Sequence, residues 1–224
     1  MSWLINRRRM GGQLAAGLGV AALGGRLAAP AEASLPIRIG DVYTLTNRPS
    51  GNAVAVFQRA LDGSLTPAGA VPTGGTGTGG GLGNQGALVL DDTGRWLFAV
   101  NPGSNDLSVF RVHGGDLTLT DRAPSGGTQP ISVTVHYGLV YVLNDGGTAN
   151  ISGFRLSQQG KLSPLPGSTR PLSSATPDAA QVEFSPHGRQ VVVTEKATNA
   201  ISTYQNGRDG LASGPHVQPS NGPT

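Results

Sequence analysis

The chain has 224 residues, of which 37% are hydrophobic and 13% are charged, a balance that allows a buried core and excludes a disordered chain. Its net charge of +3 is supplied by Arg7, Arg8 and Arg9, and no basic run with interleaved aromatic residues follows, so a nucleic-acid-binding protein is excluded. Glycine (35 residues) and proline (16 residues) fall between short strand-like runs, which indicates the turns of an all-β protein.

Residues 1–33 have the features of an export signal. "NRRRM" is a positive segment, "LAAGLGVAALGG" is an apolar stretch, and Ala31-Glu32-Ala33 before Ser34 has the small-x-small form of a cleavage site. The apolar stretch is too short, and too interrupted by glycine and Arg26, to span a membrane. We therefore expect a protein exported to the periplasm or the extracellular space, with a twin-arginine signal as one of the open routes.

A unit of roughly fifty residues recurs four times after this signal. Its central strand ends, in the four copies, at one aligned position: Asn47, Asn101, Asn144 and Glu195. After this position come a turn, a second run that ends in an aromatic residue, a glycine-leucine turn and a third run. In the last three copies a further apolar run precedes the central strand, as in "ISVTVHYG" and "QVEFSPHG". Four short antiparallel strands in a unit of this length are typical of a β-propeller blade.

The sequence therefore predicts an all-β propeller of four-stranded antiparallel blades in a partial domain at 34–224. The blades are expected at about 41–72, 86–124, 130–167 and 180–218. Residues 34–40 are too few to supply the innermost strand of the first blade, so three full blades and three strands of a fourth are expected. An open arc exposes unpaired strand edges. We expect the front half of a larger ring, closed by missing blades or by a second copy.

Two segments resemble a known family. "SVTVHYGLVYVLNDGG…NISGFRL…GKLSPLPGSTRPL" and "QVEFSPHGRQVVVTEKATNAISTY" are similar to the lactonase family of seven-bladed β-propellers, which includes bacterial 6-phosphogluconolactonase and fungal carboxymuconate cyclase. The resemblance covers roughly Asp41 to Thr224. It implies a ring of seven blades, of which about three and a half are present, and a hydrolase or cyclase acting on a small lactone or sugar-like ligand. No cofactor is expected.

The aligned position carries glutamate in only one copy, where Glu195 is followed by Lys196. The loops that follow the central strands should lie at one end of the channel. There a carboxylate beside an ammonium group suits acid or base catalysis of lactone opening, in which water is activated and the leaving alkoxide is protonated. We therefore predict that Glu195 and Lys196 are catalytic. The competing interpretation is a solvated surface ion pair worth under about 1 kcal/mol.

The candidates for substrate binding are Asn101 and Asn144 in the aligned position and Gln85 and Gln181 near the starts of inner strands. The alternative for the asparagines is turn formation through their own side chains. Where members of the resembled family often have histidine, this chain has "NQGALVL", "TQPISV" and "AAQVEF". Glutamine orients a substrate but carries no proton at neutral pH, so a catalytic histidine would have to come from the missing blades.

The histidines and the glycine-rich segment 73–84 are not predicted to form sites. No two histidines have the spacing of a metal site, and they are expected at turns of the opposite face (His136, His187) or on outer strands (His113, His216). "TGGTGTGGGLGN" contains a formal dinucleotide fingerprint, but a β blade follows in place of the required helix, so a flexible connecting loop is predicted.

Two functions follow. The first is an exported lactonase-like enzyme. The second is a non-catalytic propeller that binds a small ligand or a protein through its asparagine-rich face, or an inactive truncated fragment.

Overall fold

The computed structural model describes residues 4–5 and 37–222, and this part of the chain consists of β-strands and their connections. Most of the predicted export signal, 1–33, lies outside the described residues. Within them, no helix has the length and hydrophobicity needed to cross a bilayer.

The strands form four antiparallel sheets, one for each repeat unit. The first sheet contains β1 (Leu4–Ile5), β2 (Arg38–Leu45), β3 (Ala53–Ala60) and β4 (Leu65–Pro72). The second contains β5 (Leu88–Leu90), β6 (Trp96–Asn101), β7 (Asp106–His113) and β8 (Asp116–Pro124). The third contains β9 (Thr128–His136), β10 (Leu139–Gly146), β11 (Asn150–Leu156), β12 (Leu162–Pro164) and β13 (Arg170–Pro171). The fourth contains β14 (Ala179–Phe184), β15 (Gln190–Glu195), β16 (Ala200–Asn206) and β17 (Ala212–Pro219).

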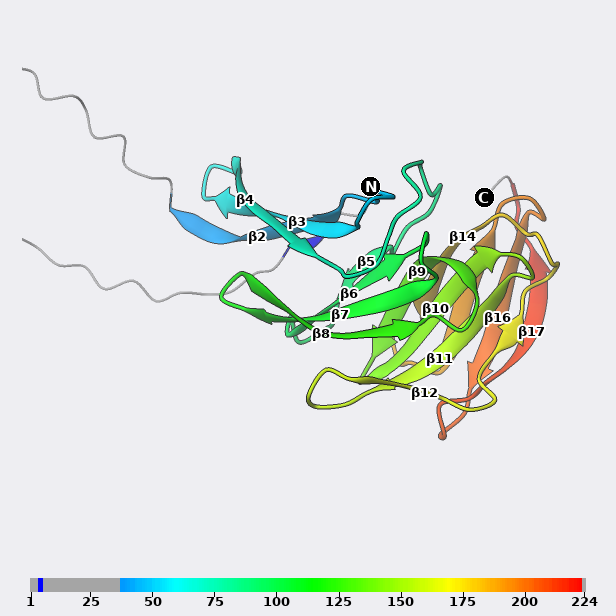
Figure 1. Ribbon diagram of the computed structural model, residues 1–224. Helices are drawn as coiled ribbons and strands as arrows, with labels where there is room; N and C mark the ends of the chain where they lie inside the picture. Colours follow the sequence, from blue (N-terminus) through cyan, green and yellow to red (C-terminus); the bar gives the residue numbers. More distant parts are fainter. Residues whose placement is uncertain (1–3, 6–36, 223–224) are drawn as a thin grey trace, which may run out of the picture.

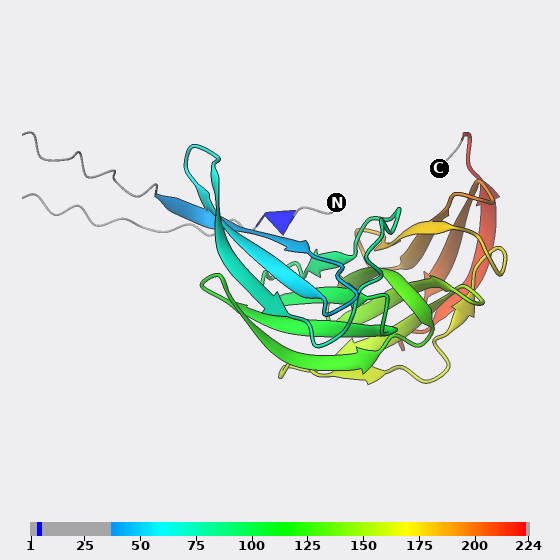
Figure 2. The same ribbon diagram turned by 45° about the horizontal axis from the view of Figure 1, so that its top comes forward.

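The four sheets follow one another along an arc that is open between the first and the fourth (Figure 1). The turned view shows the same curved row of blades, with the N-terminal blade at one end and the C-terminal blade at the other (Figure 2). This arrangement confirms the predicted fold class, a partial propeller of four-stranded antiparallel blades.

Two details differ from the sequence prediction. The first blade has a short inner strand, because β1 pairs with Tyr43 and Val42 of β2. The outer strand of the third blade is divided: β12 pairs with the end of β11 and β13 with its beginning. The loop between β12 and β13 therefore interrupts that blade's outer edge.

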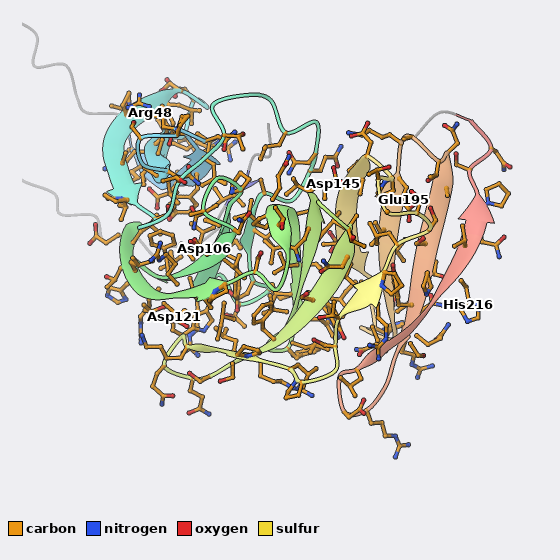
Figure 3. All side chains as sticks on the ribbon, turned by 45° about the vertical axis from the view of Figure 1, so that its right-hand side comes forward. Arg48, Asp106, Asp121, Asp145, Glu195 and His216 are labelled. Atoms are coloured by element: carbon orange, nitrogen blue, oxygen red, sulfur yellow. The ribbon has the colours of Figure 1, made fainter. Side chains whose placement is uncertain are left out.

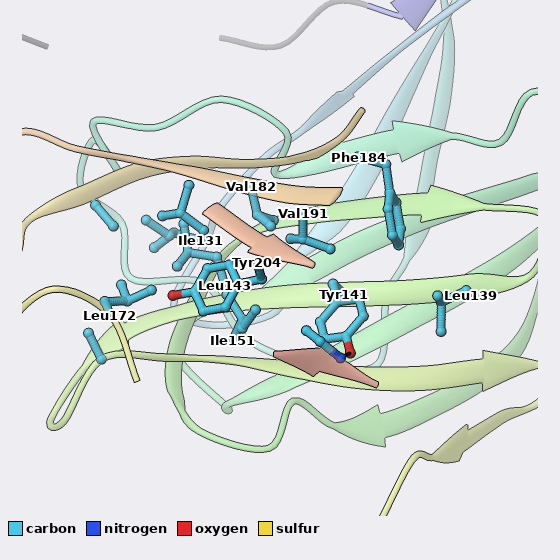
Figure 4. Close-up of a cluster of buried hydrophobic side chains, with 14 residues drawn as sticks. Ile131, Leu139, Tyr141, Leu143, Ile151, Leu172, Val182, Phe184, Val191 and Tyr204 are labelled. Carbon is cyan, nitrogen blue, oxygen red and sulfur yellow. Dashed lines mark hydrogen bonds between the residues drawn. The ribbon is translucent and has the colours of Figure 1, made fainter. Parts of the chain in front are cut away.

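Adjacent blades are held together by apolar cores between their faces. Alternate residues of a strand point to opposite faces, so β10 contributes Val140 and Val142 to the core shared with the second blade. Tyr141 and Leu143 point the other way and join the core shared with the fourth blade (Figure 4). The Tyr141 hydroxyl also links the two blades, since it donates to the Gly210 carbonyl at 2.8 Å. β10 is therefore buried along most of its length.

Candidate functional site

The aligned polar residues lie at the same end of their sheets, but three of them are buried within the blades. Asn101, Asn144 and Glu195 are 0% exposed. The Asn101 amide donates to Asp106 at 2.6 Å and to Ser108 at 2.8 Å, both on the neighbouring strand. The Asn144 amide likewise donates across the turn. Substrate binding by these asparagines stays a prediction, and their geometry favours the structural interpretation.

Glu195 is bound by donors of its own blade. One carboxylate oxygen, Oε1, accepts from the Ser202 hydroxyl at 2.6 Å and from the Ser173 backbone N–H at 3.2 Å. The other, Oε2, accepts from the hydroxyls of Ser173 and Thr198. The alternative of a solvated surface pair is therefore wrong for Glu195, because the carboxylate is removed from water and fully hydrogen-bonded. Its catalytic role stays a prediction, which this enclosure disfavours.

The structure explains why this copy of the repeat has glutamate. Asn101 faces Asp106 across the hairpin, and Glu195 faces Ala200 at the corresponding position. In the second blade the acceptor is Asp106 and the donor is the Asn101 amide. In the fourth blade Ala200 provides no acceptor. The acceptor is instead the carboxylate of Glu195 on the facing strand β15, and hydroxyl groups donate to it. Compared with the second blade, the fourth therefore has glutamate in place of asparagine on one strand and alanine in place of aspartate on the facing strand.

Lys196 belongs to a different group of side chains, between the third and fourth blades. Its ammonium nitrogen lies 3.1 Å from the Asp178 carboxylate and donates to the Gly83 carbonyl at 2.8 Å. Its backbone N–H also donates to the Asp178 carbonyl at 3.1 Å. Asp178 has φ 49, a left-handed conformation that costs a non-glycine residue energy and often marks functional positions.

Asp145 completes this group, which we call the charge cluster: Asp145, Asp178 and Lys196. Its Oδ1 accepts a 2.8 Å hydrogen bond from the Ala179 backbone at the start of β14. Burial raises the pKa of Asp145, and the negative charge of Asp178 acts in the same direction, while the Ala179 hydrogen bond and Lys196 oppose it. Figure 3 shows Asp145 and Glu195 at the same end of adjacent sheets. A carboxyl whose pKa is perturbed by burial and by neighbouring charges is a candidate for an acid-base site.

Gln181 follows Asp178 closely along the chain, and Gln85 comes from a distant segment that pairs with the residue before Gln181. The Gln85 backbone N–H donates to the Ala180 carbonyl at 3.0 Å, which places Gln85 beside the residue preceding Gln181. The Gln85 side chain is exposed, and the Gln181 amide donates to Glu183 at 3.3 Å. The segment 83–85 therefore links Lys196, through the Gly83 carbonyl, with the start of β14 next to Gln181, whereas the Asn101 amide donates within the second blade.

The glycine-rich segment is anchored rather than a freely flexible connection. The Asn47 amide donates to the Gly80 carbonyl at 2.8 Å, and the Asn47 carbonyl accepts from Gly79 at 2.8 Å. Gly77 donates to the Arg48 carbonyl at 2.8 Å and is buried against the backbone of Asn47. Glycine is required there because a side chain at position 77 would overlap the Asn47 carbonyl group. Asn47 thus fixes the segment that reaches Lys196.

Replacement of Gly77 by alanine is expected to lower the free energy of unfolding by about 1–3 kcal/mol, because the added methyl group must displace backbone. Gly80→Ala is the matched control in the same loop, since a Cβ there meets nothing within 4 Å. Urea denaturation of both variants measures the difference. Equal stabilities would show that the loop is not packed as described.

The histidines do not contribute to this site. His216 lies on the outer strand β17 as predicted, but His113 ends β7, the third strand of its sheet, because the outer strand is β8. His136 packs against Phe184 with ring centroids 5.7 Å apart, at the opposite end of the sheets from the charge cluster. Among the described residues, no three His, Cys, Asp or Glu side chains are grouped closely enough to hold a metal ion.

Comparisons with known proteins agree with this architecture. The family model "Lactonase, 7-bladed beta-propeller" matches residues 43–170. A Bacteroides fragilis protein provisionally named a 6-phosphogluconolactonase has a similar structure, with a TM-score of 0.58 at 14% identity over 87% of this chain and 58% of that one. A Lactobacillus plantarum protein has a TM-score of 0.61 at 16% identity over 80% of this chain and 52% of that one.

A Desulfotomaculum acetoxidans protein of unknown function has a TM-score of 0.58 at 15% identity, over 81% of this chain and 57% of that one. At these identities the likeness shows the fold alone. The chain spans between half and three fifths of these three structures. A comparison with curated proteins found no match.

Proposed function

Because the chain belongs to the lactonase family of seven-bladed β-propellers, we propose that it binds a small lactone at the charge cluster and opens the ring by hydrolysis. One observation carries the proposal: Asp145 is hydrogen-bonded to the Ala179 N–H, directly after Asp178, and the Asp178 carboxylate pairs with the Lys196 ammonium. The cluster occupies the end of the blades that would form one mouth of the channel in a closed ring. In this proposal Glu195 has a structural role, and Asp145 takes the acid-base role that was predicted for Glu195.

Asp145 has the features of a general base. The Ala179 hydrogen bond fixes one carboxylate oxygen, and the side chain is only partly buried, so in this proposal the other oxygen binds the attacking water. A carboxylate with a raised pKa is a stronger base than an ordinary aspartate. It removes a proton from water as the water oxygen bonds to the lactone carbonyl carbon, and the carbonyl electron pair moves onto oxygen. When the tetrahedral intermediate collapses, the ring C–O bond breaks and the leaving oxygen takes the proton back from Asp145.

In this proposal the Lys196 ammonium stabilises the negative charge that develops on the carbonyl oxygen. Such preorganised donors often provide the largest single contribution to catalysis. The Asp178 carboxylate and the Gly83 carbonyl hold the ammonium group in place before substrate arrives. Gln85 and Gln181 are near enough to the cluster to bind hydroxyl groups of a sugar lactone. These two amides favour a sugar lactone, which has hydroxyl groups, over a lactone that has none.

The test measures ring opening of D-glucono-1,5-lactone above its spontaneous rate, by NMR, with the full chain and two lysine variants. Lys196→Met is expected to lower kcat/KM by roughly a hundredfold, as for loss of an oxyanion donor. Lys161→Met is the control, because Lys161 is an exposed lysine of the third blade, paired with Asp121 of the second, and its loss should leave the rate unchanged. Saturable binding without turnover would favour the non-catalytic propeller, and equal rates for the two variants would remove Lys196 from the mechanism.

We also propose that the protein is exported. The support is the positive, apolar and small-x-small order of segments in 1–33. Cleavage after Ala33 would remove β1 together with the signal and leave β2 as an edge strand. Fractionation of the host and the mass of the secreted chain test this proposal: a chain found only in the cytoplasm would contradict export, and an intact N-terminus on the exported chain would contradict cleavage after Ala33.

A further inference from the structure

A cavity lies at the end of the blades opposite to the charge cluster. It has a volume of about 500 Å³ and is lined by the turn between β5 and β6 of the second blade and by two turns of the third blade. Leu139 begins β10 at this end and Asp145 lies near its other end, so the cavity is about 20 Å from the charge cluster along the strand. All its walls come from two adjacent blades, so the cavity does not depend on further blades or on the proposed lactone site.

Tyr137 is the most unusual residue of this cavity. It is 90% exposed and occupies, with Gly138, the two-residue turn between β9 and β10. Its φ is 46 and that of Gly138 is 79, so both residues are left-handed, as in the hairpin turns that favour Asn-Gly. A tyrosine there costs conformational energy and gains no burial. Such a local disagreement between sequence and structure is expected at functional sites.

The rest of the lining combines an aromatic wall with groups that form hydrogen bonds. Trp96 forms part of the wall, and Ser157 and Gln158 lie on the side of the third blade. Asp92 and Arg95 on the second blade line the cavity, and neither forms an ion pair within the described part of the chain. The cavity therefore offers acceptors, donors and an exposed aromatic ring together.

We infer that this cavity binds a carbohydrate ring stacked on Tyr137. A pyranose has an apolar face for the tyrosine ring, and hydroxyl groups that both donate and accept. Asp92 can accept from them, Arg95 can donate to them, and Gln158 can do both. The volume suits a mono- or disaccharide, and pockets of this kind use a few polar groups to orient an otherwise apolar contact.

Tryptophan fluorescence tests the inference directly. The chain has two tryptophans, so replacing Trp3 with phenylalanine in the full chain leaves Trp96, at the cavity, as the sole reporter. Cellobiose and methyl β-D-glucopyranoside are expected to change the emission saturably at concentrations up to roughly 50 mM. Choline is the comparison probe, because aromatic and acidic side chains also bind organic cations.

Tyr137→Ala is expected to weaken sugar binding at least fivefold, and Tyr137→Phe to preserve it within about twofold, since the stacking ring remains. Tyr137→Asn should also lose binding while its melting temperature stays equal or rises, because asparagine suits the left-handed turn. No saturable change with either sugar, saturation by choline alone, or binding that is unaffected by Tyr137→Ala would each overturn the inference.

Discussion

Replacing Glu195 with alanine is expected to lower the free energy of unfolding by about 3–5 kcal/mol, the largest stability loss predicted for this chain. The carboxylate is fully buried and accepts from Ser173, Thr198 and Ser202. Truncation leaves these donors without an acceptor, each at a cost of about 1–3 kcal/mol, and opens a cavity at the end of β15. Urea denaturation followed by circular dichroism measures the loss.

The control for this variant is Glu183→Ala. Glu183 is an exposed carboxylate on the same blade, with a 3.2 Å hydrogen bond from Thr134, and its loss should cost under about 1 kcal/mol. The double variant Glu195→Asn with Ala200→Asp rebuilds the pattern of Asn101 and Asp106 and is expected to recover part of the stability. If Glu195→Ala were no more harmful than Glu183→Ala, the carboxylate would not hold the fourth blade together.

The fold could be predicted from the sequence because its information is local and repeated. Alternation in runs such as "LVYVLN", the glycine turns and the aligned polar position together define the blade, and each copy supports the others. The inner strand of the first blade could not be predicted this way. It comes from Leu4–Ile5, which have no counterpart in the repeat and pair with Tyr43 and Val42 of β2.

The site was predicted less well because its chemistry depends on contacts between distant segments. Glu195 looked exposed beside Lys196, but Ser173 closes over it from the loop before β14. Asp145 was missed because its perturbed pKa depends on burial and on Asp178 at the start of the next blade. An alignment of the repeat units at one position shows neither of these. One signal was present: Ala200 stands where Asp106 and Asn150 stand in other copies, which indicates that Glu195 supplies a missing acceptor.

Replacing Asp145 with asparagine is expected to lower kcat/KM for lactone opening by about a thousandfold, within the range for loss of a general base. The variant should fold, because the asparagine oxygen still accepts from the Ala179 N–H. It should also be at least as stable at neutral pH. The folded-state pKa of Asp145 is raised, so the folded protein holds its proton more readily than the unfolded chain, and stability falls as pH rises through the raised pKa. The uncharged asparagine does not titrate, so the variant does not lose stability in this pH range.

The pH profile separates this role from a structural one. A base must be ionised, so activity of the native chain is expected to fall as pH drops through the pKa of Asp145, at a higher pH than the roughly 3.9 of an ordinary aspartate. Burial and the Asp178 charge raise the pKa of Asp145, so Asp178→Asn should move the fall in activity to lower pH. The rate at neutral pH should also fall, because Lys196 loses the carboxylate that holds its ammonium group. Asp145→Asn should abolish the fall in activity at low pH, because the catalysed rate itself is lost. A fall in activity at low pH that persists in Asp145→Asn, or one that Asp178→Asn leaves in place, would assign the base to another group and leave the charge cluster as a binding site.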